Sequence, residues 1–309
     1  MGKKEPLVVF GDEFADLLGR SLPRFRADYS DRIAFIMASL CKAAYFRFEK
    51  DPEEMRELDE AVARGGFELV GTFYLPPESG QNGDTEAILV KNENFAVLAF
   101  RGTAGLNDLM SDLRFFKKRA NQTRNLDNKG LEIHSGFFEA YACLHDSITE
   151  ACKEVEGMPL YFTGHSLGGA LAVIAGAFST HDNVAAVYTF GSPRVGNRNF
   201  RKLHLKTPVY RVENFLDIIT IVPFSLFKFR HVGRLIYLSR RGFRKEPALT
   251  TLHSFKRMLL IWVALLLPPL AAFRDHRMDR YIRKLAPIAL RRRSLKWDIG
   301  AFLDDLGGH

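Results

Sequence analysis

The sequence predicts an α/β fold with a mostly parallel central sheet flanked by helices on both faces. Three observations lead to this prediction. Short runs rich in β-branched and aromatic residues recur, helical patterns alternate with them, and several runs are apolar throughout, as in strands buried on both faces. The 309 residues are 47% hydrophobic, which suits a large core, and no Pro/Gly/Ser-rich linker divides them. We expect one domain over 1–309, with a core at about 30–285, an N-terminal extension 1–30, an insertion at about 223–273 and a basic tail 286–309.

The first part of the chain contains one helical pattern and three strand patterns. Residues 31–46 place apolar side chains on one side of a 3.6-residue period, which predicts a helix. Residues 67–75 and 85–90 are rich in β-branched and aromatic side chains and are separated by a turn-rich gap, so they predict two strands. The run 95–100 is apolar at every position and predicts a strand buried on both faces.

The second part of the chain alternates helices with strands. Residues 136–155 carry apolar side chains at spacings of three and four, which indicates an amphipathic helix, and 167–178 predicts a helix buried on most sides. An amphipathic helix is also expected near the chain end, after residue 276. Apolar runs predict strands over 159–163, 184–190, 208–215 and 231–239.

The strongest chemical signal is the pentapeptide Gly-His-Ser-Leu-Gly at 164–168. It follows a predicted buried strand and begins a helix rich in Ala and Gly, which is the context of a nucleophile elbow in the α/β-hydrolase fold. Gly164 and Gly168 lack a Cβ, so they permit the tight turn that exposes the Ser166 hydroxyl at the carboxyl end of the sheet. The alternative is a serine in an ordinary strand-to-helix turn. The context favours Ser166 as a nucleophile.

A serine nucleophile needs a histidine base and an orienting carboxylate, which in this fold follow it in the order serine, acid, histidine. Asp217 comes directly after the strand predicted over 208–215 and is the best candidate for the acid. Glu213 lies inside that strand and is better explained as a half-exposed or paired strand carboxylate. We favour His276 as the base because it precedes the final helix, and His253 is its rival.

Hydrolysis by such a serine also requires N–H donors aimed at the developing oxyanion. The backbone N–H of Leu167 directly follows the nucleophile and is one candidate. The second donor should come from the loop after an earlier central strand. Thr103, which follows the run 95–100, offers both an N–H and a hydroxyl, although a plain turn threonine is the alternative.

Together these residues resemble the class 3 lipase family, which includes the filamentous-fungal triacylglycerol lipases. The likeness extends from about 95 to 217 and adds an Asn-x-x-Asp acid setting and a late His followed by Tyr. One departure is the stretch 104–110, where the family often has a lid tryptophan and this chain has none. Four segments carry the resemblance in the family's order: Phe-Arg-Gly-Thr at 100–103, His-Ser-Gly-Phe at 134–137, Thr-Gly-His-Ser-Leu-Gly-Gly at 163–169 and Thr-Phe-Gly-Ser-Pro-Arg-Val-Gly-Asn at 189–197.

The resemblance implies hydrolysis of lipid carboxylic esters through an acyl-enzyme intermediate. It implies Ser166, Asp217 and His276 as the catalytic triad, Thr103 and Leu167 as the oxyanion hole, and neither a cofactor nor a metal. The runner-up activities are those of a phospholipase A1 or a short-chain esterase. From a different class of protein, a catalytically silent membrane-binding pseudohydrolase is the alternative.

The net charge of +8 is concentrated late in the chain, where 225–309 holds 18 Lys and Arg against 6 Asp and Glu. A basic surface suits nucleic acid or an anionic membrane, and ordinary solvated faces are the alternative. No nucleic-acid-binding pattern accompanies the charge, so we expect no nucleic-acid partner. We expect peripheral contact with an anionic membrane through this basic third, while the oligomeric state is not predicted.

An apolar stretch over 258–273 interrupts this basic third. It has 16 uncharged residues and a Pro-Pro pair, so it is too short and too broken for a transmembrane helix, which needs about 20 residues. It could line or cap an acyl pocket or dip into a bilayer interface, and a buried core helix is the alternative.

The remaining observations concern the cellular environment. The three cysteines, Cys41, Cys143 and Cys152, lie in helical patterns and are interpreted as small buried hydrophobes rather than a disulfide framework or metal ligands. No secretory signal pattern begins the sequence, and Pro6 argues against N-myristoylation. We therefore expect a cytoplasmic location.

Overall fold

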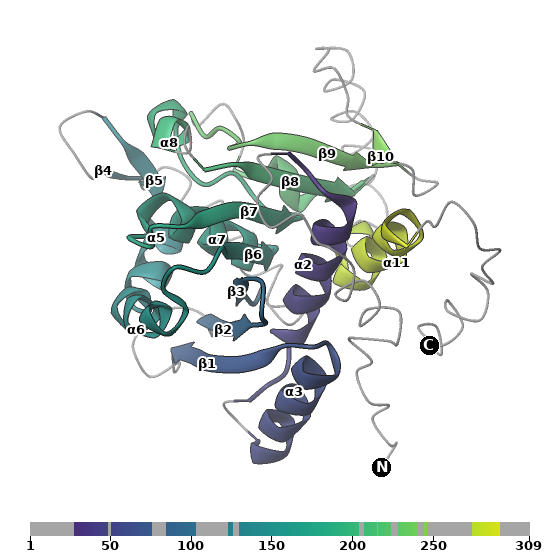
Figure 1. Cartoon of the computed structure of the whole chain (residues 1–309). Coiled ribbons are helices and arrows are strands. Elements are labelled where there is room, and N and C mark those ends of the chain that lie inside the picture. Colours follow the sequence, from purple (N-terminus) through teal and green to yellow (C-terminus); the bar gives the residue numbers. More distant parts are fainter. Residues whose placement is uncertain are drawn as a thin grey trace.

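The computed structural model describes residues 28–48, 51–75, 85–102, 123–125, 130–203, 207–214, 216–223, 228–239, 244–245 and 274–290. These residues form a central sheet of eight strands in the order β1-β2-β3-β6-β7-β8-β9-β10 (Figure 1). The strands from β3 to β9 in this order run parallel, while β1, β2 and β10 pair antiparallel at the two edges. The predicted α/β fold with a mostly parallel sheet is confirmed.

The strands of the central sheet lie close to their predicted positions. Their bounds are β1 Glu68–Leu75, β2 Thr85–Lys91, β3 Ala96–Phe100, β6 Leu160–His165, β7 Val184–Phe190, β8 Val209–Asn214, β9 Arg234–Leu238 and β10 Arg244–Lys245. A separate two-stranded sheet consists of β4 Thr123–Asn125 and β5 Glu132–His134.

Helices lie on both faces of this sheet. Their bounds are α2 Asp31–Ala43, α3 Pro52–Arg64, α5 Ser135–Ala142, α6 His145–Ala151, α7 Leu167–Phe178, α8 Arg198–Leu203 and α11 Met278–Ala289. Short 3-10 helices are η2 Cys152–Val155, η3 Ile219–Ile221 and η5 Arg274–His276.

The sheet separates two hydrophobic cores, because successive side chains of a strand point to opposite faces. In β3, Val97 and Ala99 pack into the core that contains α2 and α11. Their neighbours Leu98 and Phe100 pack into the core that contains α5 and α7. The continuous apolar run predicted a strand buried on both faces, and every residue of β3 is buried.

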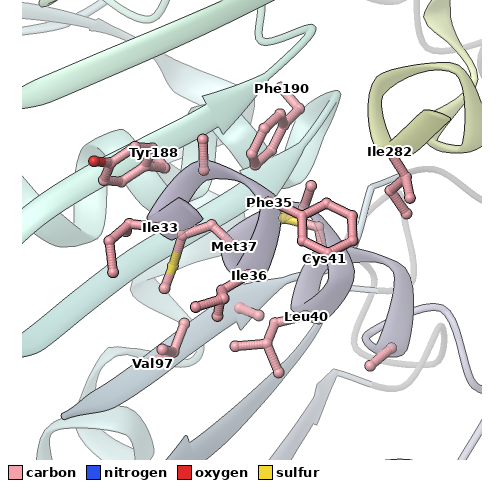
Figure 2. Close-up of a cluster of buried hydrophobic side chains, with 14 of the residues drawn as sticks. Ile33, Phe35, Ile36, Met37, Leu40, Cys41, Val97, Tyr188, Phe190 and Ile282 are labelled. Atoms are coloured by element: carbon pink, nitrogen blue, oxygen red, sulfur yellow. The ribbon is translucent and has the colours of Figure 1, made fainter. Parts of the chain in front are cut away.

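Helix α2 crosses the first core next to α11 (Figure 1). It begins where the Ser30 hydroxyl accepts a hydrogen bond from the Ile33 N–H and Asp31 faces the positive end of the helix dipole. The helix ends at Ala43, earlier than predicted, and Tyr45 lies beyond it. Figure 2 shows the side chains that meet here, with α2 supplying most of them: Ile33, Phe35, Ile36, Met37, Leu40, Cys41, Val97, Tyr188, Phe190 and Ile282.

The carboxyl ends of the parallel strands meet at one edge of the sheet. The register pairs Phe100 with Gly164 and His165 with Phe190, so β3, β6 and β7 end side by side. Strand β8 continues the order and ends at Asn214. Residues that directly follow these strands are therefore brought together, as is general for binding sites in open α/β sheets.

The prediction of a single helix over 136–155 was wrong in one respect. The chain forms three consecutive pieces, α5, α6 and η2, with a break at Cys143 and Leu144. The apolar spacing that suggested one helix still holds in part, because Phe137, Tyr141, Leu144 and Ile148 are all buried. The apolar spacing therefore predicted which face of the segment is buried, but it did not predict the turn between α5 and α6.

Helix α3 was not predicted, although the sequence carries its signals. Asp51 caps the helix by accepting a hydrogen bond from the Glu53 N–H at 2.9 Å, and Pro52 occupies the first helical position. Only Leu58, Ala61 and Val62 are buried, so the apolar face is too narrow to dominate the pattern.

The expectation for the cysteines is confirmed for one residue and wrong for another. Cys41 is buried in the core, and burial raises the pKa of its thiol to about 12. Cys143 is exposed because it lies at the break between α5 and α6, while Cys152 is partly exposed.

Several predictions fall on parts of the chain outside the described residues. These are the N-terminal extension up to 27, the stretch 103–110 that includes Thr103, the apolar segment 258–273 with the rival base His253 nearby, and the tail from 291. Among the described helices, none is long and apolar enough to cross a membrane.

Candidate active site

Ser166 occupies the sharp turn between β6 and α7. Its backbone has φ 57° and ψ −125°, a region that residues with a side chain rarely adopt. Such a conformation costs about 1–3 kcal/mol and is found mainly at functional sites. Burial of one large side chain of α7, such as Leu171, stabilises by about 1.5–3 kcal/mol and can offset this cost.

The two flanking glycines make this turn possible. A Cβ on Gly164 would lie 2.1 Å from the Gly168 carbonyl oxygen, and a Cβ on Gly168 would lie 2.3 Å from that of Phe100. Real Cβ contacts are never this short, so both positions require glycine. The Ser166 N–H donates to the Phe190 carbonyl oxygen at 2.9 Å, which holds the turn against the end of β7. This is the geometry of a nucleophile elbow.

Asp217 lies just beyond β8 and is completely buried. Its Oδ1 accepts from the Ile219 N–H at 2.9 Å, and its Oδ2 accepts from the Tyr281 hydroxyl at 2.5 Å. Both oxygens also lie within 2.9 Å of Nδ1 of His276. A buried carboxylate is expensive to desolvate unless it is hydrogen-bonded, and here each oxygen is.

His276 ends the short helix η5 and is 59 residues from Asp217 in the sequence. Because the carboxylate can only accept, Nδ1 must carry the proton, and Nε2 of the neutral ring is then an acceptor. Among the described residues, Nε2 of His276 and Oγ of Ser166 are both buried and have no hydrogen-bond partner. A serine–histidine pair requires a hydroxyl donor and an imidazole acceptor that are not engaged elsewhere, and both occur at this edge of the sheet.

Gly191 connects these residues. It follows β7 with φ 59°, next to the Phe190 that accepts the Ser166 N–H. A Cβ at Gly191 would lie 2.5 Å from Oδ2 of Asp217 and 2.9 Å from Nδ1 of His276. The end of β7 is therefore in contact with Ser166 on one side and with the Asp217–His276 pair on the other.

Sequence reasoning gave no role to several residues that surround this pair. Tyr281 donates to Asp217 and accepts from the Asn214 N–H at 3.0 Å. Burial, followed by the charge of Asp217, holds the pKa of its hydroxyl well above its usual range, so it remains a donor. Asn214 in turn donates from Nδ2 to the Asp275 carbonyl oxygen at 2.9 Å and accepts from Lys284. In the sequence, the only signals that pointed to Asn214 and Tyr281 were the Asn-x-x-Asp and His-to-Tyr spacings.

Glu213 belongs to a different cluster. It is buried inside β8, and its Oε1 lies 3.3 Å from Nε of Arg211 and 3.8 Å from Nε2 of His231. The interpretation as a paired strand carboxylate agrees with this arrangement, although Glu213 is fully buried rather than half-exposed.

Of the two predicted oxyanion donors, Leu167 lies among the described residues and Thr103 does not. Leu167 is the first residue of α7, and the first N–H groups of a helix have no partner within the helix. Thr103 lies outside the described residues, but its neighbour Gly102 does not. A Cβ on Gly102 would lie 3.0 Å from Cβ of Ser166, so the chain after β3 passes directly beside the serine.

His165 and Tyr45 complete the surroundings. Nδ1 of His165 lies 2.7 Å from the Tyr45 hydroxyl, and Nε2 lies 2.6 Å from the His276 carbonyl oxygen. Burial and then the neighbouring His276 lower the pKa of His165 to about 3. In the described ranges, no group of three or more His, Cys, Asp or Glu side chains could hold a metal ion.

The elbow, the buried Asp–His pair and the parallel sheet define an α/β-hydrolase. The family pattern described as "Lipase (class 3)" matches residues 97–227, so this part of the chain is similar to the class 3 lipases. The match covers the elbow and Asp217, while His276 lies beyond it.

Two relatives illustrate the likeness in sequence. A chloroplastic phospholipase A1 of Arabidopsis thaliana is 34% identical over 162 residues, which cover 45% of this chain and 36% of the relative. A triacylglycerol lipase of Ricinus communis is 30% identical over 224 residues, which cover 51% of this chain and 41% of the relative. The chain therefore matches less than half the length of these relatives.

Solved structures show the same fold. The triacylglyceride lipase of Rhizomucor miehei superimposes with a TM-score of 0.58 at 18% sequence identity, covering 83% of this chain and 99% of that one.

Proposed function

We propose that this protein is a serine hydrolase that cleaves carboxylic esters of lipids. The observation that carries the proposal is the buried Asp217–His276 pair at the same edge of the sheet as the strained Ser166 turn. The fold alone would not require either feature, and a catalytically silent pseudohydrolase would have no need to keep both a strained serine turn and a buried Asp–His pair.

The proposed mechanism has two steps. Ser166 Oγ attacks the ester carbonyl carbon and passes its proton to Nε2 of His276, while Asp217 stabilises the imidazolium. The tetrahedral intermediate then collapses, the leaving alkoxide takes that proton, and the acyl group remains on Ser166. In the second step His276 takes a proton from water, the hydroxide attacks the acyl carbon, and the proton returns to Ser166 as the fatty acid leaves.

The oxyanion that forms in both steps needs fixed donors, and loss of one costs about 2.7–4 kcal/mol of transition-state stabilisation. The Leu167 N–H at the positive end of α7 is the first proposed donor. Thr103 remains the predicted second donor. Its support is the position of Gly102, which brings the chain directly beside Ser166.

Acylglycerols are the substrates we favour, and phospholipids are the second candidate. Relatives named as a triacylglycerol lipase and as a phospholipase A1 match similar shares of this chain, so the comparisons favour lipid esters as a class. The surplus of Lys and Arg over 225–309 favours a substrate in an anionic membrane.

We further propose that the basic C-terminal third binds the surface of anionic membranes as a peripheral contact. We also propose that the protein is cytoplasmic. Flotation with liposomes tests the contact. The protein should float with vesicles that contain an anionic phospholipid, should not float with neutral vesicles, and should be released at high salt, because screening weakens such contacts. Equal flotation with both vesicle types would contradict the proposal.

Activity is tested with purified protein and a panel of acylglycerols, phospholipids and nitrophenyl esters, beside labelling by a fluorophosphonate. We expect turnover and covalent labelling at Ser166, with both lost in Ser166→Ala. A folded protein with neither turnover nor labelling would overturn the proposed function. Labelling without turnover of any lipid would retain the serine hydrolase and reject lipid esters as the substrate.

A further inference from the structure

His165, the residue before Ser166, is hydrogen-bonded at both ring nitrogens, and these two bonds have a defined direction. Its Nε2 lies 2.6 Å from the carbonyl oxygen of His276, which can only accept, so Nε2 carries the proton. In the neutral ring Nδ1 is then an acceptor, and the Tyr45 hydroxyl, 2.7 Å away, must donate to it. The neutral state is supported by burial, which lowers the pKa of His165 to about 3.

The Tyr45 end of this chain of hydrogen bonds lies against the loop that follows β3. A Cβ on Gly102 would lie 2.5 Å from the Tyr45 hydroxyl oxygen, so the Gly102 backbone packs directly on that group. The guanidinium carbon of Arg101 lies 5.9 Å from the centre of the Tyr45 ring, and Arg101 forms a buried ion pair with Glu86 of β2. Tyr45 is therefore held in place by the end of β3.

At the other end of this series of hydrogen bonds, Nε2 of His165 holds the backbone of His276. The rings of His165 and His276 are 4.5 Å apart and tilted by 30°, so His165 contacts both the carbonyl group and the imidazole of its partner. The preceding carbonyl, that of Asp275, accepts from Asn214. The two bonds fix η5, a three-residue helix that is too short to hold its own orientation.

Asp217 alone does not fix the direction of Nε2 in His276. Hydrogen bonds to Nδ1 anchor one side of the imidazole, but the ring can still tilt about that side. A catalytic base must keep its acceptor atom within hydrogen-bond reach of the nucleophile, and a displacement of about 1 Å can cost roughly 100-fold in rate.

We propose that His165 is a positioning residue, which links Tyr45 and the loop after β3 to the backbone of His276 and so directs Nε2 toward Ser166. It carries no proton between these groups. This proposal rests on the proposed function, because it gives His165 a role only if His276 is the base. It predicts that the two hydrogen bonds of His165 contribute unequally, since only the bond from Nε2 reaches His276.

Two substitutions of His165 separate those bonds. In His165→Gln the amide nitrogen can take the place of Nε2 and still donate to the His276 carbonyl, whereas the amide of His165→Asn reaches only as far as Nδ1. We expect His165→Asn to lower kcat about tenfold, as for a lost buried hydrogen bond, and to leave KM within about twofold. His165→Gln should recover most of that loss. A merely structural role would reduce the amount of folded protein and would not separate kcat from KM.

Tyr45→Phe tests the other end, and Tyr141→Phe is its matched control. The Tyr141 hydroxyl lies 3.0 Å from Nδ1 of His145, the same type of contact outside the site. We expect Tyr45→Phe to lower kcat by roughly threefold to tenfold and Tyr141→Phe to leave it unchanged. The proposal is overturned if His165→Asn is as active as His165→Gln, or if Tyr45→Phe behaves like its control.

The tautomer of His165 can be tested without activity, by nitrogen NMR of the side chain in the wild-type protein. We expect a proton on Nε2 and none on Nδ1 at neutral pH. A proton on Nδ1, or on both nitrogens, would overturn the proposal. If the wild-type protein neither hydrolyses esters nor reacts at Ser166, the proposed function fails, and the NMR result still reports separately whether the chain of hydrogen bonds exists.

Discussion

Two buried carboxylates, one inside β8 and one just beyond its end, each lie near a histidine, but the two pairs are hydrogen-bonded differently. Asp217, beyond the end of the strand, lies 2.8 Å from Nδ1 of His276. Glu213, inside the strand, lies 3.8 Å from Nε2 of His231 and shares its Oε1 with Arg211. The two pairs differ in what else the carboxylate is bound to and in whether Nε2 of the histidine donates to a backbone carbonyl.

The comparison shows that proximity of a carboxylate and a histidine is insufficient. Nε2 of His231 lies 2.8 Å from the Thr220 carbonyl oxygen and is therefore already used as a donor. Arg211 neutralises Glu213, so that carboxylate cannot polarise a ring as strongly. Asp217 has no such competitor among its described partners, and Nε2 of its histidine has no hydrogen-bond partner among the described residues. Position at the carboxyl end of the strand makes the difference.

The largest difference between the pairs should appear when each histidine is removed. We expect His276→Ala to lower kcat by about 10⁴-fold to 10⁶-fold, as for loss of a triad base, and His231→Ala to change it by less than about threefold. Ester turnover by both variants, with circular dichroism to confirm folding, measures this. Comparable losses in the two folded variants would mean that the wrong pair has been assigned.

The carboxylates should differ next. Asp217→Asn keeps the shape of the side chain but no longer requires the proton on Nδ1 of His276, so we expect kcat to fall about 10⁴-fold. Glu213→Gln should leave kcat nearly unchanged and instead lower the free energy of unfolding by about 3–5 kcal/mol, because Arg211 loses its buried partner. Kinetics together with denaturant unfolding separate the two effects. An inactive but stable Glu213→Gln protein would contradict the comparison.

Two glycines next to these pairs provide a third test. Gly191, with φ 59°, lies against Asp217 and His276, while Gly233, with φ 81°, lies against the backbone of Val209 near His231. We expect Gly191→Ala to lower kcat by about 100-fold through displacement of the pair. Gly233→Ala should lower the melting temperature and leave kcat of the folded fraction intact. If both alanine variants lose only stability, Gly191 does not position the site.

The last expected effect concerns pH and does not involve turnover. Burial, and then the neighbouring His276, lower the pKa of His165 from 6.5 to about 3. The unfolded chain therefore binds a proton below pH 6.5 that the folded protein does not bind until about pH 3. The free energy of unfolding should fall as pH decreases through this window, by up to about 1.4 kcal/mol per pH unit.

His165→Gln should remove this part of the slope, whereas His231→Gln should not. Denaturant unfolding at several values between pH 3.5 and pH 6.5 measures the slopes. Identical slopes in wild type and His165→Gln would show that His165 is not held neutral by the fold.

Local sequence determined the frame of this protein. Apolar runs of strand length and small-residue helices predicted the parallel sheet, and the Gly-His-Ser-Leu-Gly pentapeptide predicted the turn at Ser166, because a tight strand-to-helix turn has strict local requirements. The preference for Asp217 over Glu213 also came from local position, just beyond the strand rather than within it. The catalytic roles of these residues remain predictions for the experiments above.

Only the tertiary structure decided which side chains meet around the serine. The partners of His276 are Asp217 and His165, which lie 59 and 111 residues away in the sequence, and those of His165 include Tyr45, 120 residues away. No spacing in the sequence specifies such contacts, because they depend on how the helices close over the sheet. For the same reason Tyr45 looked like an ordinary core aromatic in the sequence, and the late His-to-Tyr pattern pointed to Tyr281 without showing that its hydroxyl donates to Asp217.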